Sequence, residues 1–350
     1  MKFGIGPLGF RRPPGDETPF PAIYESEVAL AELAESVGFD SAWVAEHHFA
    51  PDGYVPSPIA ASGAIAARTT GMEVGIGIAL APLYEPLRLA EDAAVVHQLA
   101  SAGGGRFALG LGLGYRAIEL EAFGIAPEER VPRLLDAVDT CRGAWSEGSF
   151  SLDGRAVSYP EVDVTPKPET PPSLVVGAIA DAGIERAARV ADGYVLAPGF
   201  DREGVADRFA VLTDALEAAG RDPAEFDAYW MQYAFVHEDG REAAWEAIRE
   251  HYLYTRKAYL EYGNESVDSE GSLTGEELEE RAAELEDEWR SHVVHGTPGE
   301  VVEQLAPYAD CYEGELHAIC QFHHPGMEYE PARRAIELFG EEIIPDLGWA

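Results

Sequence analysis

An acid, two adjacent histidines and an aromatic residue directly follow a short apolar run near the start of the chain. The run Ser41–Ala45 ends at "EHHF", in which His47 and His48 are the titratable pair. A metal site is one interpretation, with His323-His324 as further ligands, because a catalytic metal needs about three protein ligands. Proton transfer near neutral pH is the second interpretation. The third is a histidine pair that only satisfies carbonyls at a strand end.

Three glycines alternate along a second apolar run, "RFALGLGLG", at Gly110, Gly112 and Gly114. Glycine within a strand lets a flat ligand or another backbone come close. The spacing is GxGxG inside a strand, whereas the dinucleotide fingerprint is GxGxxG at the turn into a helix. We therefore expect no Rossmann site here, and tight packing inside a barrel remains the alternative to ligand contact.

The elements that must position these residues alternate between strand-like runs and helical patterns, such as the helix expected at Glu25–Val37. Such alternation indicates βαβ units and a parallel sheet. Eight expected strands favour an α/β protein with a (β/α)₈ TIM barrel, in which active residues follow the carboxyl ends of the strands. The expected strands are Lys2–Gly6, Ser41–Ala45, Met72–Leu80, Arg106–Gly114, Ser173–Ile179, Asp192–Pro198, Ala228–Val236 and Glu315–Phe322.

Two segments fall outside this alternation. Residues 151–172 are rich in Pro and Asp and are expected to form an extended excursion with a small hairpin. Residues 241–291 form an acidic helical insertion after the seventh strand, broken by "GNESVDSEGSLTGEE", which we expect to be a mobile loop. The sequence contains no internal repeat and no long low-complexity linker. We expect residues 1–350 to form a single domain.

The charge of the chain is strongly negative. Its 350 residues carry a formal net charge of −38, and lysine occurs only at Lys2, Lys167 and Lys257. Repulsion of this size disfavours nucleic acid and anionic membranes as partners. An acidic, lysine-poor composition resembles that of proteins from extreme halophiles, where molar salt screens charge within about 3 Å. With three scattered cysteines, no long apolar run and no signal-peptide pattern, we expect a cytoplasmic protein.

In addition, the chain resembles the bacterial-luciferase-like family of flavin- or deazaflavin-dependent barrel oxidoreductases. The resemblance rests on "GFDSAWVAEHHF", "PLYEPLRLAEDAAVVHQL", "GGRFALGLGLGYRAIELEAFG", "PPSLVVGAI", "RAARVADGY", "HGTPGEVVEQL" and the closing "HHPGMEYEPARRAIELFGEEIIP". It implies a barrel that holds a reduced flavin at its carboxyl-terminal end. His47 matches the family's catalytic histidine, which transfers a proton beside the reactive edge of the flavin. Glu46 would orient the site or contact the flavin edge.

The resemblance also implies a cofactor site built from three segments. A non-prolyl cis peptide is expected at Gly77-Ile78, against the flavin face. A strand-to-helix turn of small residues, with backbone N–H groups and a helix N-terminus, would hold the phosphate without lysine. Tyr115 and Arg116 would add a cationic contact, although Arg116 could equally form a surface ion pair. The residues of the turn and its flank are Gly112, Gly177, Ala178, Ile179, Ala180, Asp181, Ala182 and Gly183.

The expected function is that of a flavin-dependent monooxygenase. Reduced FMN, delivered by a separate NAD(P)H:flavin reductase, would react with O₂ to oxidise a small organic substrate. A homodimer is expected through residues 54–68 and 86–99. Three alternatives remain: hydride transfer with F420, a catalytically silent flavin-binding protein, and a metal-dependent hydrolase. The residues expected to line the substrate pocket are His48, Tyr84, Trp230, Tyr233 and Phe322.

Overall fold

Eight parallel strands close into a barrel in this computed structural model, which describes residues 1–263 and 275–348. Around the barrel the order is β1, β2, β3, β4, β7, β8, β9 and β11, and β11 pairs again with β1. This confirms the (β/α)₈ barrel and all eight expected strands. The barrel strands are β1 Lys2–Leu8, β2 Ser41–Val44, β3 Glu73–Leu80, β4 Arg106–Gly112, β7 Ser173–Gly177, β8 Gly193–Leu196, β9 Asp227–Val236 and β11 Leu316–Gln321.

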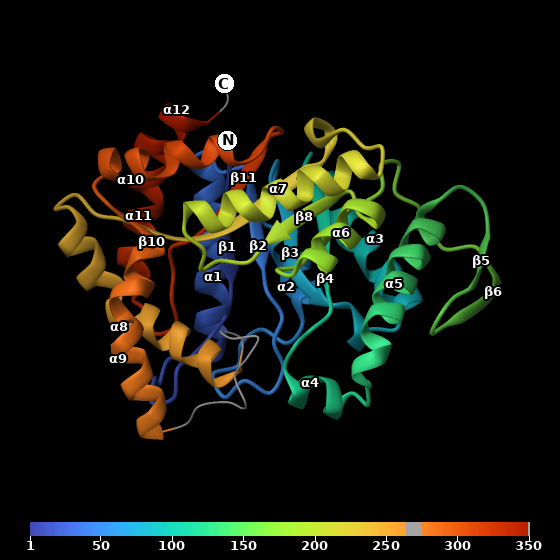
Figure 1. Cartoon of the computed structure of the whole chain (residues 1–350), viewed down its shortest axis with the longest axis horizontal. Coiled ribbons are helices and arrows are strands. Elements are labelled where there is room, and N and C mark those ends of the chain that lie inside the picture. The colour runs from blue at the N-terminus through green and yellow to red at the C-terminus, as the bar shows by residue number, and fades with distance from the viewer. Residues whose placement is uncertain (264–274, 349–350) are drawn as a thin grey trace.

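Helices lie between the strands and cover the outside of the barrel (Figure 1). Helix α1 begins at Phe20, earlier than the predicted Glu25, because Pro21 stands in the first turn, where its missing N–H is tolerated. The helices are α1 Phe20–Ser36, α2 Pro58–Ala66, α3 Pro86–Ala102, α4 Ala117–Ala122, α5 Arg130–Trp145, α6 Asp181–Val190, α7 Arg202–Ala218, α8 Arg241–Glu261, α9 Gly275–Ser291, α10 Pro298–Leu305, α11 Tyr329–Leu338 and α12 Ile344–Leu347. Short helical turns are η1 Ala81–Leu83, η2 Pro127–Glu129, η3 Pro223–Glu225, η4 Ala306–Cys311 and η5 Phe339–Ile343.

The two segments outside the alternation are built differently. Strands β5 (Phe150–Asp153) and β6 (Ser158–Val162) form an antiparallel hairpin that projects from the barrel (Figure 1). This confirms the expected hairpin. After β9, α8 and α9 pack against each other. The loop expected between them falls largely on residues 264–274, which lie outside the described residues.

One strand was not anticipated from the sequence. Strand β10 (Val293–Gly296) pairs in parallel with the last four residues of β9, outside the closed ring. Its four residues are all buried. A segment of four residues directly after a helix, in which only Val293 and Val294 are large apolar residues, is too short to show a strand period.

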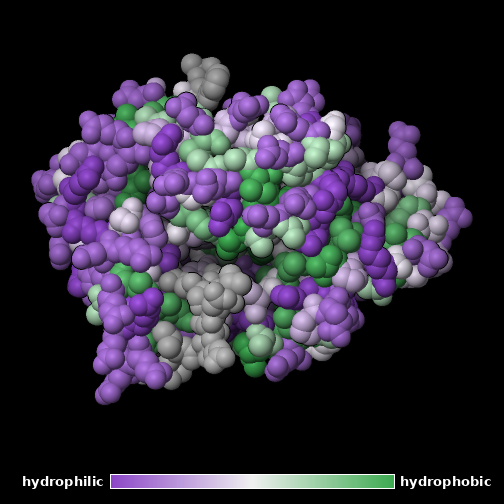
Figure 2. All heavy atoms as spheres, in the orientation of Figure 1, coloured by the Kyte–Doolittle hydropathy of each residue, from purple (hydrophilic) through white to green (hydrophobic). Residues whose placement is uncertain are grey.

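The two ends of the barrel are separated by a packed interior layer. Its inward-facing members are Trp43, Ala108, Val175, Val195, Tyr229, Met231 and Ile319. We call the end where the strands start the base and the end where they finish the mouth. Figure 1 shows α4 at the mouth and both chain termini at the opposite end. Hydrophilic residues cover most of the face in Figure 2, densely over α8 and α9.

Candidate functional site

Glu46 follows β2 at the mouth and is held by three hydrogen bonds. Its Oε2 accepts from the backbone N–H of Leu80 at 2.5 Å. Its Oε1 accepts from the Tyr84 hydroxyl at 2.7 Å and from His48 Nε2 at 3.0 Å. The carboxylate therefore ties the end of β2 to the end of β3, and it fixes two side chains expected in the substrate pocket. A direct catalytic role of Glu46 stays a prediction.

His47 is buried at the mouth, and its Nδ1 donates to Glu119 Oε1 at 3.2 Å. A carboxylate only accepts, so this bond places the imidazole proton on Nδ1. Burial lowers the pKa of His47, although the hydrogen bond to Glu119 opposes the shift. The ring is thus neutral at neutral pH. Among the described residues Nε2 has no hydrogen-bond partner, so it is available as a proton acceptor.

Glu119 on α4 gathers several donors around this histidine. Its Oε1 accepts from the backbone N–H of His48 at 2.8 Å and from Arg116 Nη1 at 2.9 Å. Burial would raise the pKa of Glu119, but the bonds from His47, His48 and Arg116 outweigh it and hold the pKa below its usual value. Glu119 is therefore an anion that fixes the orientation of His47.

Arg116 is committed to this cluster. Besides Glu119, its Nη1 donates to the carbonyl of His48 at 2.6 Å, and its guanidinium lies 3.8 Å from the ring centre of Tyr262. The contact to a cofactor phosphate that the sequence suggested for Arg116 stays a prediction. The alternative surface ion pair also differs from the structure, because Arg116 is buried.

Four tyrosine rings also lie close to His47. The ring of His47 lies within centroid distances of 4.7 to 6.0 Å of four tyrosine rings, those of Tyr54, Tyr115, Tyr259 and Tyr262. Two of these rings come from the end of α8, and the hydroxyls of Tyr54 and Tyr259 are 3.1 Å apart. The acidic insertion after β9 therefore contributes a wall of the mouth. Aromatic walls of this kind keep water from the imidazole.

The peptide bond between Gly77 and Ile78 is cis, as predicted. It falls where the β3–β4 register shifts, between Ile76 and Ala79. The Ile78 side chain fills the space that a Cβ on Gly112 or Gly177 would occupy, at 1.6 and 2.7 Å from those positions. The glycines thus make room for the Ile78 side chain. This is the tight packing inside the barrel that was one interpretation of the glycine pattern, and it sets the surface that a ligand, the other interpretation, would meet. Ile78 is partly exposed, so it offers an apolar platform at the mouth.

The turn after β7 leads into α6 through small, exposed residues. The N-cap is Ala180, which has no side-chain hydrogen bond to offer, so the first turn of α6 lacks a side-chain cap. Gly183 is packed against Ala178, whose Cβ would lie 2.6 Å from a Cβ on Gly183. The turn runs Gly177, Ala178, Ile179, Ala180, Asp181, Ala182 and Gly183, as the sequence suggested.

Arg186 is a cation near this turn that the sequence analysis missed. Its Nη1 lies 3.9 Å from the Cβ position on Gly183. Burial, together with Arg189, lowers the pKa of Arg186. Among the described residues it forms no ion pair or hydrogen bond. Cations are scarce in this chain, so an arginine one helical turn after Gly183 is the sequence signal that could have indicated this residue.

The predicted substrate-pocket residues divide into two groups. Tyr84 and His48 meet at Glu46, and Tyr233 faces the barrel side of β9, against Tyr252 and His324. Trp230 instead stacks on Tyr308 of η4 with ring centres 4.1 Å apart.

Phe322 packs edge-on against Phe39 and Phe339. The structure does not bring Trp230 or Phe322 to the mouth. Along a strand, side chains alternate between faces, so Trp230 and Tyr233, three positions apart, point to opposite sides of β9.

The metal interpretation of the histidine pairs finds no donor set. Among residues 1–263 and 275–348, no group of three or more His, Cys, Asp or Glu side chains could hold a metal ion. His323 Nδ1 instead pairs with Glu27 at 3.1 Å. Within the same described ranges, no helix has the length and apolar character to cross a membrane.

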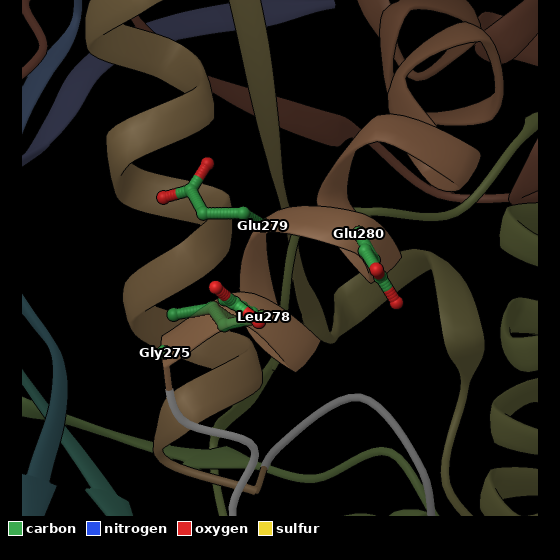
Figure 3. A pocket seen from close by; sticks show the side chains of 5 residues that line it. Gly275, Leu278, Glu279 and Glu280 are labelled. Carbon is green, nitrogen blue, oxygen red and sulfur yellow. The ribbon is translucent and has the colours of Figure 1, made fainter.

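A separate hollow of about 570 Å³ lies beside the start of α9 (Figure 3). Its described lining is Gly275, Glu276, Leu278, Glu279 and Glu280. Glu279 is paired with Lys257 of α8 at 2.9 Å. A lining dominated by carboxylates does not suit an anionic cofactor, and none of the predicted site residues lies in it.

Comparison with known proteins agrees with this geometry. The family model described as luciferase-like monooxygenase matches residues 1–312. The F420-dependent glucose-6-phosphate dehydrogenase of Nakamurella multipartita is 30% identical over 332 residues, covering 92% of each chain. The alkanal monooxygenase alpha chain of the Kryptophanaron alfredi symbiont is 23% identical over 367 residues, covering 99% of this chain and 98% of that one.

Solved structures give the same result. The monooxygenase RslO1 from Streptomyces bottropensis superposes with a TM-score of 0.80 at 27% identity, covering 99% of both chains. An F420-dependent secondary alcohol dehydrogenase shares the fold, with a TM-score of 0.76 at 18% identity over 98% of both chains. Because the family model spans most of its length, the chain belongs to the luciferase-like monooxygenase family.

Proposed function

We propose that the protein is a flavin-dependent monooxygenase that uses reduced FMN, supplied by a separate reductase, and O₂ to oxidise a small organic substrate. The observation that carries the proposal is His47, a buried neutral imidazole with its Nδ1 fixed by Glu119 and its Nε2 without a partner among the described residues. The likeness to RslO1 at 27% identity supports the same reaction class. When bound, a reduced flavin supplies the activation of oxygen.

The chain's own residues have three tasks in this proposal. Ile78, seated over Gly112 and Gly177, offers an apolar surface for the flat ring of the cofactor. The uncapped first turn of α6 offers backbone N–H groups to the phosphate. His47 Nε2 accepts or returns a proton at the reacting atoms, and Glu119 keeps the imidazole in the required tautomer.

F420 is a second candidate cofactor, with hydride transfer as the reaction. It is favoured by the 30% identity to the Nakamurella multipartita dehydrogenase, whose name states F420 dependence. F420 carries a longer anionic tail, which favours a basic surface near the mouth. The net charge of −38 and the commitment of Arg116 to Glu119 weigh against it.

Reconstitution distinguishes the two cofactors. The protein is titrated anaerobically with reduced FMN and with reduced F420, and O₂ uptake is then measured after mixing with air. The proposal predicts tighter binding of FMN and O₂ uptake that depends on the protein. Tight binding of F420 with negligible binding of FMN would replace the monooxygenase proposal with the hydride-transfer one.

Two substitutions at Asp181 test the phosphate contact. Ala180 has ψ 145°, which a following proline accepts, so Asp181→Pro removes one N–H while keeping the helix start. Asp181→Ala removes the same charge and keeps the N–H. We expect Asp181→Pro to bind FMN about tenfold more weakly than Asp181→Ala. Riboflavin, which lacks the phosphate, should bind both variants equally, and an equal loss for riboflavin would refute the phosphate contact.

We also propose that the protein forms a homodimer through α2 and α3. Val95 and Leu99 on α3 are exposed apolar side chains, at 48% and 42%. They lie one helical turn apart and so form one apolar face. Sedimentation velocity of Val95→Glu/Leu99→Glu should give a monomer where the parent protein gives a dimer. A monomeric parent protein at micromolar concentration would contradict the proposal.

A further inference from the structure

Arg11 enters the mouth after β1 and keeps part of its guanidinium unpaired. Its side chain is 5% exposed, and Nε donates to Asp52 Oδ2 at 2.6 Å. The guanidinium carbon lies 4.4 Å from the ring centre of Tyr54 and 5.4 Å from that of Tyr254. Nη2 is buried and has no hydrogen-bond partner in the described part of the chain. Asp52 therefore balances the charge of the arginine at Nε, while the neighbouring Nη2 keeps an unbonded donor.

His324 enters the mouth after β11. The residue is fully buried, and within residues 1–263 and 275–348 neither Nδ1 nor Nε2 has a hydrogen-bond partner. Its ring lies 5.9 Å from that of Tyr233 and 5.6 Å from that of Tyr252. Burial lowers the pKa of His324 well below its ordinary value, so the ring is neutral, with one N–H donor and one acceptor.

Arg11 and His324 face the same part of the mouth. Strands β1 and β11 are neighbours in parallel register, with Ile5 opposite Cys320, so the segments that follow them emerge side by side. Burial, His323 and His251 lower the pKa of His324 more than Arg11 does, and the smaller influence of the Arg11 charge agrees with the neighbouring positions of the two strands. Aromatic rings of Tyr54, Tyr233, Tyr252 and Tyr254 flank the two groups.

Buried donors and acceptors in native proteins are almost always bonded to protein, to water or to a ligand. Unpartnered buried atoms also occur singly elsewhere, for example at Trp230 Nε1 and Arg208 Nε. Two such residues that converge on the mouth, one of them a guanidinium, form the arrangement that recognises a carboxylate or phenolate through charge-assisted hydrogen bonds. The surrounding rings suit an aromatic body.

We propose that Arg11 and His324 bind an anionic oxygen, a carboxylate or phenolate, carried by an aromatic substrate. The inference rests on the proposed function, because it assigns the substrate class of the same site. The substrate would sit on the β11–β1 side of the mouth, and the cofactor would sit over Ile78 near β3, β4 and β7. His47, at the end of β2, would then stand between them.

Paired probes that differ in charge test this assignment by calorimetry. The carboxylate pair is 2-naphthoate and 2-naphthamide. The phenolate pair, in mildly alkaline buffer, is 4-nitrophenolate and 4-nitroanisole. We expect the protein to bind at least one anion about tenfold or more tightly than its neutral partner, since hydrogen bonds to charged groups are the strong ones. The pair that shows the preference identifies the oxygen that is recognised.

Two variants and one control complete the test. His324→Phe keeps the ring volume, and Arg11→Gln/Asp52→Asn replaces the ion pair with neutral amides, so that no buried charge is left alone. Both should lose most of the preference. Arg106→Gln/Glu73→Gln removes a comparable pair at the base and should keep it. Equal affinity for charged and neutral probes in the parent protein, or a preference that both variants retain, would overturn the inference.

The same titrations separate this inference from the proposed function. They are run with and without FMN. A charge preference in a protein that fails to bind FMN would leave the oxyanion site standing and refute the cofactor. Binding of FMN without a charge preference would refute the oxyanion site and leave the proposed cofactor standing.

Discussion

The base and the mouth of the barrel both hold buried polar side chains, but the two ends differ in how far these side chains are paired with one another. At the base, Glu73 pairs with Arg106 and accepts from the Tyr229 hydroxyl at 3.0 Å. His317 Nε2, also at the base, lies 2.9 Å from Ser41 Oγ. A small hollow there, of about 190 Å³, is lined by groups that are mostly already paired.

At the mouth, by contrast, Glu119 Oε2, Arg11 Nη2 and both nitrogens of His324 are buried without partners among the residues that the structure describes. Glu73 Oε2 at the base also accepts no hydrogen bond there, but it is ion-paired with Arg106. Buried polar groups that hydrogen-bond to one another stabilise a fold, whereas buried polar groups without a hydrogen-bond partner are suited to binding a ligand. From this difference we expect the buried polar groups at the base of the barrel to be structural, and we propose that those at the mouth are functional.

The largest expected effect separates His47 from His317, one buried histidine at each end. His47→Ala should keep the fold and nearly unchanged FMN affinity, but lose about 10²–10⁴ in turnover, the usual contribution of a general acid or base. Steady-state turnover and thermal unfolding measure the two quantities.

His317→Asn is the matched control for that variant. It should lower stability, because Ser41 Oγ loses His317 and keeps only the hydrogen bond from Trp43 Nε1, while turnover per folded molecule stays normal. If His47→Ala kept its turnover, or if His317→Asn lost as much turnover as His47→Ala, the functional contrast between the ends would fail.

The next effect concerns the ion pair at the base. Arg106→Met leaves the buried Glu73 carboxylate with only Tyr229, which we expect to cost about 1–3 kcal/mol in free energy of unfolding. Urea unfolding gives this value, and turnover of the folded fraction should not change. Arg106→Gln/Glu73→Gln should recover most of the stability. A tenfold fall in turnover in either variant would show that the base takes part in function.

Protonation should affect both ends, in a direction fixed by the histidines. Burial lowers the pKa of His317 to about 3, and it also lowers those of His47 and His324. Unfolded histidines titrate near 6.5, so the unfolded chain binds more protons below that pH, and stability falls as pH falls through about 6.5. His323, whose pKa Glu27 raises, opposes this.

Each histidine whose pKa burial lowers contributes at most about 1.4 kcal/mol per pH unit, over the range between 6.5 and its pKa in the folded protein. Bound FMN or an aromatic anion should reduce the contribution from the mouth and leave that of His317. Urea unfolding as a function of pH, with and without ligand, separates the contribution of the histidines at the mouth from that of His317. A stability that rises on acidification would contradict the assigned neutral state of these histidines.

The smallest expected difference between the ends concerns salt, because the acidic residues behind the net charge of −38 are spread along the whole sequence. Hydrophilic residues cover most of the face in Figure 2. Thermal stability should rise with KCl towards molar concentrations, beyond the range in which screening saturates. His317→Asn and His47→Ala should show the same salt dependence as the parent protein. Greatest stability in dilute buffer would remove the expectation of a halophilic origin.

Much of the frame was predictable from the sequence because its signals are local. Apolar runs marked all eight barrel strands, and the match at "VGIGIAL" located the cis bond at Gly77-Ile78. The contacts that complete the site are not local. Glu119 reaches His47 from 72 positions away, and Tyr259 and Tyr262 come from an insertion that the sequence marks only as acidic and helical.

Other misses had a usable signal. The faces of β9 and β11 alternate, so the placement of Trp230 and Phe322 outside the mouth could have been read from strand parity once Tyr233 was assigned inward. The short strand β10 and the six-residue α4 are too brief for a reliable periodic pattern. Tertiary contacts stabilise them instead.

The most direct test of the contrast between mouth and base is histidine NMR during ligand binding. The protein is labelled at histidine, the signals are assigned with His47→Ala and His317→Asn, and reduced FMN is added under anaerobic conditions. We predict that the His47 signal shifts on binding and that the His317 signal stays in place. Binding of FMN that shifts His317 and leaves His47 unmoved would contradict the assignment of the functional site to the mouth.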